Sequence, residues 1–465
     1  MKYLSTRGGV EPVGFAEAVM MGLGTDGGLL VPERLPVLAP ATLCAWSRLR
    51  FQDLAVEVIA PFVGDDIPRS DLIDLVYRSY STFSHAEVAP LREVAGRRYL
   101  ELFHGPTAAF KDVALQLLGN VFEHLLARDG GELNIVGATS GDTGSAAIFG
   151  VRGKPRIKIF ILHPKGRVSP VQERQMTTVL EDNVHNIALR GTFDDAQRIV
   201  KALFNDLDFK AGCHLGAVNS INWVRILAQT VYYFYAWGRI TGGDPDRLVS
   251  FAVPTGNFGD VFAGFLARRM GLPIGRLIIA TNRNDILTRF VNSGVYAKGK
   301  VYHTLSPAMD IQIASNFERY LYYLLDEDAG AVRTLLAEME QTGHMQVNGE
   351  RLRQVQSDFS ARAVGDSETL AQIRETYEAS GYVLCPHTAV GARAAADLPD
   401  AVVLATAHPA KFNEAVREAI GSAASPPPSL QGLMDKPTRS AELDAEPEAV
   451  RAYIRHTLAA ALSTR

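Results

Sequence analysis

The sequence predicts an α/β protein with mostly parallel sheets covered by helices on both faces. From about residue 98 onward, short apolar runs of strand length alternate with longer segments whose apolar residues recur at helical spacing. Turns rich in glycine or hydroxyl groups follow several of these runs, as is typical of the carboxyl ends of parallel strands. The 465 residues suffice for two or three domains, and the apolar content of 47% supports a sizeable core.

The N-terminal part differs in style from the rest and predicts a small, mainly helical domain. Glycines and prolines punctuate its beginning, and helical patterns follow around residues 51–62 and 70–80. The boundary is expected near Pro90. We therefore predict an N-terminal domain of residues 1–95 and a larger region of residues 96–465 that contains two α/β lobes.

The larger region contains the strands. They are expected at residues 133–138, 157–162, 184–189, 248–253, 277–280 and 402–405. Helices are expected after Lys111, from about residue 194 to 204, and around the aromatic run 231–237, which indicates a buried helix. Residues 319–380 are charged and helical in pattern and predict a helical insertion, and a polar helix is expected to close the chain.

Composition excludes several classes of protein. A net charge of −4 and a pI near 6.3 provide no basic surface for nucleic acid. The three cysteines, without a C-x-x-C pair, favour a reducing compartment such as the cytoplasm over disulfides or a thiolate metal site. No apolar run reaches 18 residues, so no membrane span is expected. The eleven histidines lack metal-ligand spacing, so no transition-metal site is expected.

Lys111 is the most informative residue. It follows the turn signal Gly105-Pro106 and opens a long helical pattern. An amine held at the start of a helix, beside Phe103 and Phe110, can lose its proton and act as a nucleophile toward an aldehyde. That property is what an enzyme dependent on pyridoxal phosphate requires.

A glycine-bearing loop follows the strand expected at 248–253. It consists of Gly256, Asn257, Phe258, Gly259 and Asp260, and a helix is expected from Val261. Two glycines allow a ligand to approach the backbone closely, and the N–H groups at a helix start attract an anion, so the loop predicts a phosphate site. Because short Gly-x-x-Gly turns are common, an ordinary β–α turn is the more frequent explanation of such a loop taken alone.

A second loop follows the strand at 133–138. It contains Ser140, Gly141, Asp142 and Thr143, and a helix is expected to begin near Ser145. Hydroxyl and N–H groups at a helix start could bind a carboxylate. The alternative, slightly favoured for this loop taken alone, is that Asp142 or Thr143 is simply the N-cap of the helix.

A third anion site is indicated before the aromatic helix. Asn219 and Ser220 precede that helix and Arg225 lies on its first turns, where a guanidinium group suits a phosphate. The alternative, favoured in isolation, is a helix cap followed by a solvated arginine.

Two further side chains lie at the end of the strand 402–405. The hydroxyl of Thr406 could hydrogen-bond a ring nitrogen, and His408 is expected to form a structural hydrogen bond rather than to act in catalysis. The sequence contains no G-x-S-x-G motif of a serine hydrolase and no G-x-G-x-x-G motif after the first strand, which argues against hydrolase and dinucleotide-binding classes.

In combination, these motifs resemble the threonine synthase family in its longer bacterial and fungal form, within the fold-type II pyridoxal phosphate enzymes whose fold is like that of the tryptophan synthase β subunit. The resemblance extends from Tyr3 to Phe412. It rests on five motifs in order, namely residues 103–112, 138–144, 219–225, 256–260 and 282–285.

The resemblance implies a role for each motif. Lys111 would form the imine with the cofactor and act as the base, residues 256–260 would hold the cofactor's phosphate, and Thr406 would face the pyridine nitrogen. The substrate's carboxylate would bind residues 140–143, and its phosphate would bind Asn219, Ser220 and Arg225. The shorter threonine synthases have asparagine where Asp142 stands, so the role of this carboxylate stays open.

The implied reaction converts O-phospho-L-homoserine and water into L-threonine and phosphate, in a monomer or a homodimer. The nearest rival is a fold-type II enzyme that eliminates or replaces at Cβ, such as a serine/threonine dehydratase or a cysteine synthase, which would not need a second anion site. The sequence also leaves open a relative that has lost its chemistry and a purely structural α/β protein.

Overall fold

The computed structural model describes residues 1–139, 141–218 and 220–463, with the side chains described up to residue 460. Contacts divide the chain into two compact units. The first unit contains residues 1–114 and 220–427, and the second contains residues 115–219 and 428–465. Helix α5 (Lys111–Asp129) begins in the first unit and continues in the second. None of the helices in the described part of the chain has the length and apolar character needed to cross a membrane.

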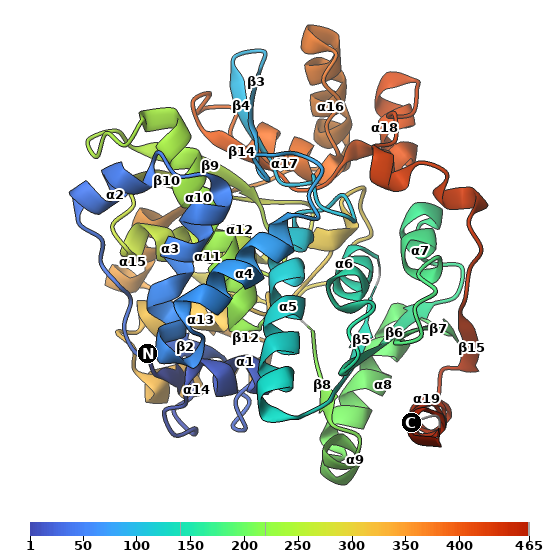
Figure 1. Cartoon of the computed structure of the whole chain (residues 1–465). Coiled ribbons are helices and arrows are strands. Elements are labelled where there is room, and N and C mark those ends of the chain that lie inside the picture. The colour runs from blue at the N-terminus through green and yellow to red at the C-terminus, as the bar shows by residue number, and fades with distance from the viewer. Residues whose placement is uncertain (140, 219, 464–465) are drawn as a thin grey trace. The chain divides into compact units, whose positions relative to one another are not determined.

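The second unit is built on a five-stranded parallel sheet of order β15-β7-β6-β5-β8. Its strands are β5 (Leu133–Ala138), β6 (Ile157–Pro164), β7 (Val184–Arg190), β8 (Leu215–Gly216) and β15 (Ala441–Asp444). Helices α6 (Asp142–Val151) and α7 (Pro170–Thr177) cover one face, and α8 (Phe193–Asn205) and α19 (Pro447–Ser463) cover the other, with the short α9 (Leu207–Gly212) after α8 (Figure 1). The strands predicted at 133–138, 157–162 and 184–189 are confirmed as β5, β6 and β7, and the helix predicted at about 194–204 is confirmed as α8.

The first unit is built on a six-stranded sheet of order β13-β10-β9-β14-β4-β3. Only the edge strand β3 is antiparallel to its neighbour. The strands are β3 (Leu91–Val94), β4 (Arg97–Glu101), β9 (Val249–Pro254), β10 (Ile274–Thr281), β13 (Phe359–Ala363) and β14 (Val402–Ala405). The predictions at 248–253, 277–280 and 402–405 are confirmed as β9, β10 and β14.

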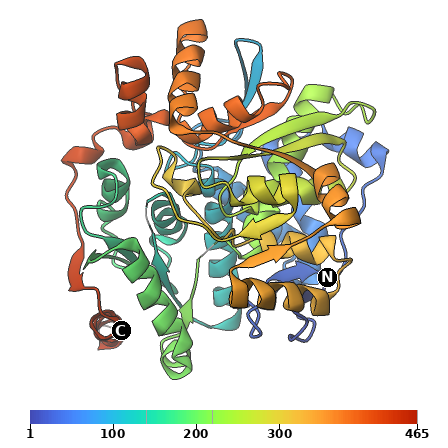
Figure 2. The ribbon, with the colours of Figure 1, turned by 180° about the vertical axis from the view of Figure 1, so that it is seen from behind.

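Successive side chains of β9 point to opposite faces of this sheet. The Phe251 ring lies 4.9 Å from the ring of Tyr233 on α10 (Trp223–Thr241), which lies against α11 (Gly259–Arg269) on that face. Ala252 lies in the core cluster on the opposite face, formed with α16 (Asp366–Ser380), α17 (Pro386–Ala394) and α18 (Asn413–Ile420). Figures 1 and 2 show α16 and α18 side by side in both views.

The N-terminal residues belong by their contacts to the first unit. They form the antiparallel pair β1 (Tyr3–Ser5) and β2 (Leu30–Pro32) and the helices α1 (Phe15–Met21), α2 (Pro40–Trp46), α3 (Phe51–Val63) and α4 (Arg69–Tyr80). The helices expected around residues 51–62 and 70–80 are confirmed as α3 and α4. Helix α3 packs against α10, whose aromatic run is buried as predicted.

The segment 319–380 requires a correction, because it is not purely helical. Besides α13 (Phe317–Leu324), α14 (Ala329–Thr342), α15 (Gly349–Asp358) and α16, it contains β12 (His344–Gln346) and β13. Strand β12 pairs with β11 (Val295–Ala297), which follows α12 (Ile286–Ser293), and β13 is an edge of the six-stranded sheet. Both are short, and β13 is only partly buried, so neither shows the apolar run by which a buried strand is predicted.

Two helices begin earlier than expected. Helix α6 begins at Asp142 instead of near Ser145, and α11 begins at Gly259 instead of Val261. In both cases a glycine occupies the first turn, and because glycine has low helix propensity the pattern hides the true beginning of the helix.

Candidate active site

The backbone brings Lys111 and Thr406 together. Strands β4 and β14 are parallel neighbours, and the segments that follow them remain paired beyond the sheet. The amide N–H of Phe110 donates to the carbonyl of Thr406 at 2.8 Å, and Ala109 forms a bridge with Ala407. Lys111 is 9% exposed and Thr406 is 5% exposed. The lysine and the threonine expected to face one cofactor ring therefore lie on adjoining segments at the carboxyl end of the sheet.

Lys111 is the first residue of α5, as the sequence predicted. Its Nζ lies 5.3 Å from the centroid of the Phe110 ring, so the amine is held in partly apolar surroundings. The preceding loop contains Ala108 at φ 56°, a left-handed conformation that is unusual for a residue other than glycine. Strained backbone of this kind is often found where a functional side chain must be presented.

A buried polar group that the sequence did not reveal lies beside Lys111. The carboxylate of Asp112 is fully buried and accepts hydrogen bonds from the N–H of Thr107 at 2.8 Å and from its hydroxyl at 2.7 Å. The Lys411 ammonium donates to the Thr107 carbonyl at 2.7 Å. Burial raises the pKa of Asp112 to about 6, although the Thr107 hydrogen bonds and the charge of Lys411 oppose the shift. These contacts close the loop onto the first turn of α5.

The loop after β9 has the geometry of an anion site. Phe258 is the N-cap of α11 at φ 65° and offers no capping side chain. The first N–H groups of a helix have no partner within the helix, and its dipole favours an anion. A Cβ at Gly256 would lie 2.6 Å from the carbonyl oxygen of Ala308, so the close approach of these two segments requires glycine.

Asp260 belongs to the loop predicted to bind phosphate, but its side chain is bound by two tyrosines of another helix. Its carboxylate accepts hydrogen bonds from the hydroxyls of Tyr232 at 2.5 Å and Tyr233 at 3.0 Å, both on α10. Burial raises the pKa of Asp260 to about 6. Because the side chain is bound to tyrosines, only its backbone N–H remains for a phosphate. No local pattern in the sequence indicates this buried arrangement.

Arg225 is the third residue of α10 and is 4% exposed, so the alternative of a solvated arginine is wrong. Asn222 caps this helix, its side chain accepting from the N–H of Val224 at 3.1 Å. The Nε and Nη1 atoms of Arg225 have no hydrogen-bond partner among the described residues, and burial lowers the pKa of this guanidinium to about 10. A buried cation with unused donors fits an anionic ligand. The predicted residue Asn219 lies outside the described residues.

The loop at the start of α6 belongs to the second unit. Its N-cap is Gly141, at φ 153°, so the alternative in which Asp142 or Thr143 is the N-cap is wrong. The hydroxyl oxygen of Thr139 instead accepts from the N–H groups of Gly141 at 3.0 Å and Gly144 at 2.9 Å. Asp142 is buried and accepts from the Nε2 of Gln172 at 2.7 Å. Ser140 lies outside the described residues.

His408 has the structural role that the sequence favoured. Its Nδ1 accepts from the N–H of Ala410 at 3.2 Å and caps the turn after β14. Burial lowers the pKa of this histidine to about 4, so the ring is neutral at physiological pH.

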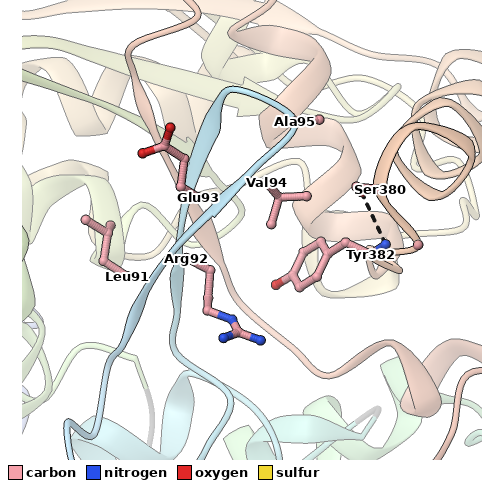
Figure 3. A pocket seen from close by; sticks show the side chains of 8 residues that line it. Leu91, Arg92, Glu93, Val94, Ala95, Ser380 and Tyr382 are labelled. Atoms are coloured by element: carbon pink, nitrogen blue, oxygen red, sulfur yellow. Dashed lines mark hydrogen bonds between the residues drawn. The ribbon is translucent and has the colours of Figure 1, made fainter.

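A separate cavity of about 600 Å³ lies on the β3–β4 hairpin of the first unit, next to the end of α16. In Figure 3, Arg92 and Val94 point to the side where Tyr382 lies, whereas Leu91 and Glu93 point away. The Tyr382 hydroxyl donates to Glu101 at 2.8 Å, and Arg92 lies 3.7 Å from the same carboxylate. No residue predicted for the active site lines this cavity.

The residues of the first unit fit pyridoxal phosphate. They provide an amine for the aldehyde at Lys111, a helix start without a capping side chain for the phosphate at α11, and a hydroxyl for the ring nitrogen at Thr406. The unused donors of Arg225 remain available for a second anion.

Fold and site together define a fold-type II enzyme that depends on pyridoxal phosphate. The family described as "Pyridoxal-phosphate dependent enzyme" matches residues 99–407. "Threonine synthase N terminus" matches residues 2–80, and "Threonine synthase, C-terminal" matches residues 388–454. The chain belongs to the threonine synthase family, which confirms the resemblance and the cofactor expected from the sequence.

Similar proteins match over nearly the whole chain. A threonine synthase of Pseudomonas aeruginosa is 49% identical over 98% of both chains, and that of Saccharomyces cerevisiae is 48% identical over 90% of this chain and 89% of the yeast chain. The solved structure of a PLP-bound threonine synthase from Brucella melitensis has a TM-score of 0.95 and 47% identity, covering 98% of this chain and 99% of that one. The yeast enzyme's structure has a TM-score of 0.94 and 45% identity, with the same coverage.

Proposed function

We propose that this chain is a threonine synthase that releases phosphate from O-phospho-L-homoserine and adds water at Cβ, giving L-threonine. The observation that supports this activity most directly is the buried guanidinium of Arg225 with unused Nε and Nη1 donors, in the same unit as Lys111 and the α11 loop. Burying a cation without a partner is unfavourable, and an anion that pairs with this guanidinium would offset that cost. A substrate with its own phosphate provides that anion.

Each part of the cofactor has a residue to hold it. Bound pyridoxal phosphate withdraws electrons from the substrate's Cα and so makes its proton acidic. Lys111 would hold the aldehyde through its Nζ, and the N–H groups at the start of α11 would hold the phosphate. Thr406 would offer a neutral hydroxyl to the ring nitrogen. A hydroxyl does not keep that nitrogen protonated as a carboxylate would, so the ring withdraws electrons less strongly. The residues around the substrate must therefore contribute more to stabilising the transition state.

Lys111 is the proposed general base. Its free amine would take the Cα proton, pass that proton to the substrate's phosphate, and then take a Cβ proton. Phosphate would leave from Cγ with the C–O bonding electrons and the passed proton, and the ammonium of Lys111 would return the Cβ proton to Cγ. Water would then add its OH group at Cβ, and its remaining proton would be returned to Cα, which completes L-threonine. Arg225 and Ser220 would hold the substrate's phosphate, and residues 141–143 would hold its carboxylate.

The decisive experiment measures phosphate release from O-phospho-L-homoserine together with the amino acid formed. We expect equal amounts of phosphate and L-threonine, and an Arg225→Ala variant whose kcat/KM falls about a hundredfold through loss of a charged phosphate contact. An enzyme that reacts only at Cβ would not form threonine from this substrate, and its activity on serine would be nearly unchanged by the same substitution.

The role of Lys111 has a direct chemical test. Borohydride reduction of the holoenzyme followed by peptide mapping should place the cofactor label on Lys111. The Lys111→Ala protein should lack the visible absorbance of the wild type. A label on a different lysine would contradict the proposed role.

We further propose the domain division into residues 1–95 and 96–465. It is supported by the ends of the family matches, at residue 80 and from residue 99. The three free cysteines support a reducing compartment, for which we propose the cytoplasm. A monomer or a homodimer would suit this activity, and size-exclusion chromatography with light scattering distinguishes the two.

A further inference from the structure

Two segments of the first unit are proposed to bind anions, namely the segment that contains Ser220 and the loop of residues 256–260, and we call them the anion loops. One side chain at the start of α13 contacts both. The Nδ2 of Asn316 donates to the carbonyl of Ser220 at 3.0 Å and to that of Asn257 at 3.2 Å. Its backbone N–H also donates to the Asn257 carbonyl, at 3.0 Å. Asn316 is fully buried, although it is about 60 residues from the second loop and almost 100 from the first. These bonds link the segment before Arg225 to the loop before α11.

A buried arginine fixes the position of that asparagine. The Nη1 of Arg319 donates to the Oδ1 of Asn316 at 2.5 Å and its Nη2 donates to the carbonyl of Ile221 at 2.5 Å. Its Nε donates to the carbonyl of Leu30 in β2 at 3.0 Å. Arg319 is fully buried, and burial lowers its pKa to about 9. Because all these acceptors are neutral, burying this charge is costly, and the guanidinium provides geometry that a smaller side chain would not.

The residues that follow strand β1 also bind α13. The carboxylate of Glu318 accepts from the hydroxyl of Thr6 at 2.6 Å and from the Nε and Nη2 of Arg7 at 3.0 and 2.9 Å. Arg319 meets β2 through Leu30, so adjacent residues of α13 bind both N-terminal strands or the residues directly after them. The N-terminal segment is therefore connected to both anion loops through a single turn of helix.

Fixing the carbonyls of these loops also orients their N–H groups. A trans peptide is planar, and its C=O and N–H point in opposite directions. When Asn257 directs its carbonyl at Asn316, the N–H of Phe258 must point away from Asn316. The same holds for the N–H of Ile221, which follows the bound carbonyl of Ser220. The orientation of donors in both loops thus depends on the same buried side chain.

We propose that Asn316 and Arg319 are positioning residues that set the orientation of both anion loops together, and that the N-terminal strands β1 and β2 act on the site through them. The part that concerns the substrate rests on the proposed function. The part that concerns the cofactor does not, because the Asn257 contact lies in the loop of α11.

Asn316→Asp is the sharpest test, since it keeps an acceptor for Arg319 and removes the two side-chain donations. We expect the dissociation constant for pyridoxal phosphate and the KM for O-phospho-L-homoserine each to rise about tenfold, with kcat reduced less than about threefold. A residue with a merely structural role would lower the active fraction, and hence kcat, and leave both constants unchanged. That result, or a rise in only one constant, would overturn the proposal.

Ser315→Ala is the matched control. The Ser315 hydroxyl lies 2.6 Å from that of Ser220, and among the described residues its side chain has no hydrogen bond to the loop of α11. This variant should raise the KM and leave the dissociation constant of the cofactor within about twofold of the wild type. A Ser315 variant that weakened both would show that the loops move together without Asn316.

Glu318→Gln tests the N-terminal connection, because it removes the charge that pairs with Arg7 and keeps the size of the side chain. Both constants should rise about threefold, whereas Asp53→Asn, which removes an exposed ion pair of α3, should change neither. Constants within experimental error of the wild type for Glu318→Gln would overturn the N-terminal part.

If phosphohomoserine is not turned over, the proposed function fails, but the part of this proposal that concerns cofactor binding can still be tested. Calorimetric titration with inorganic phosphate then replaces the KM. Asn316→Asp should weaken phosphate binding, and unchanged binding of phosphate and of cofactor would overturn the proposal.

Discussion

The glycine-bearing loops before α11 and before α6 look alike in sequence but are supported in different ways. In the first unit, the loop of α11 is fixed by side chains distant in sequence: Asn316 binds the carbonyl of Asn257, and tyrosines of α10 bind Asp260. In the second unit, the loop of α6 is held by Thr139, which directly precedes it, and by Gln172 of the next helix.

The difference matches the ligands that we propose for the two loops. A resident cofactor benefits from a site that is fixed before it binds, because less ordering is needed when it does. A loop for a substrate that must enter and leave needs fewer fixed contacts. We therefore expect substitutions at the α11 loop to lower stability and cofactor affinity. Substitutions at the α6 loop should change only the KM for the substrate.

The largest effect is expected from Asp260. Its pKa is raised from 3.8 in the unfolded chain to about 6 by burial, so its contribution to stability is complete below about pH 4 and is lost as the pH rises through 6. The unfolding free energy of the wild type relative to Asp260→Asn should therefore fall by about 3 kcal/mol between pH 4 and pH 7. Denaturant titrations at several pH values measure it, and a constant difference would mean that the carboxylate is not desolvated.

Gly256→Ala should have the next largest effect. The added Cβ would lie 2.6 Å from the carbonyl oxygen of Ala308, so one of the two segments must shift. We expect the dissociation constant for pyridoxal phosphate to rise about thirtyfold, the size of an overpacking penalty of about 2 kcal/mol. Gly365→Ala is the control, because no atom lies within 4 Å of its added Cβ. Unchanged cofactor affinity in Gly256→Ala would show that the α11 loop is more adaptable than its contacts indicate.

Thr139→Val tests the other loop. It removes the hydroxyl oxygen that accepts from the N–H groups of Gly141 and Gly144, so the KM for the substrate should rise about tenfold. The affinity for pyridoxal phosphate should stay within about twofold of the wild type, and Thr139→Ser should restore the KM. Loss of cofactor from the valine variant would break the distinction between the two loops.

Gln172→Ala should have the smallest effect. It removes one hydrogen bond to Asp142, and we expect a rise of about threefold in the KM. Steady-state kinetics suffices to measure it. A larger rise than in Thr139→Val would show that the orientation of Asp142 matters more than the amides of the loop.

Much of the fold could be predicted from the sequence because its buried strands are continuous apolar runs. The prediction matches strands β5 and β14 to the residue and β6, β7 and β9 to within two residues at each end, whereas it covers only residues 277–280 of β10. It misses the inner strand β4 and the edge strands β3, β8, β13 and β15. Strand β15 reads Ala-Glu-Leu-Asp and β13 reads Phe-Ser-Ala-Arg-Ala, so neither shows the pattern of a strand buried on both faces. Their pairing is decided by the neighbouring strand.

The candidate site divides in the same way. Lys111, Gly256 and the position of Arg225 could be found because a helix start, a close backbone approach and a charged first turn leave signals within a few residues. Asn316 and Arg319 leave none, since they bind backbone carbonyls that any residue type supplies. Asp112 directly follows the predicted lysine, yet its partnership with Thr107 depends on a folded loop.

By itself, the sequence determined where most of the buried strands and the longer helices form and which chemical groups are present at the strand ends. These features depend on neighbours within a few residues of the chain. Only the tertiary structure decided that Arg225 is buried with unused donors, that the Asp260 carboxylate faces tyrosines and that α13 holds both anion loops of the first unit. Burial and long-range hydrogen bonds arise from segments far apart in the chain, and no local pattern encodes them.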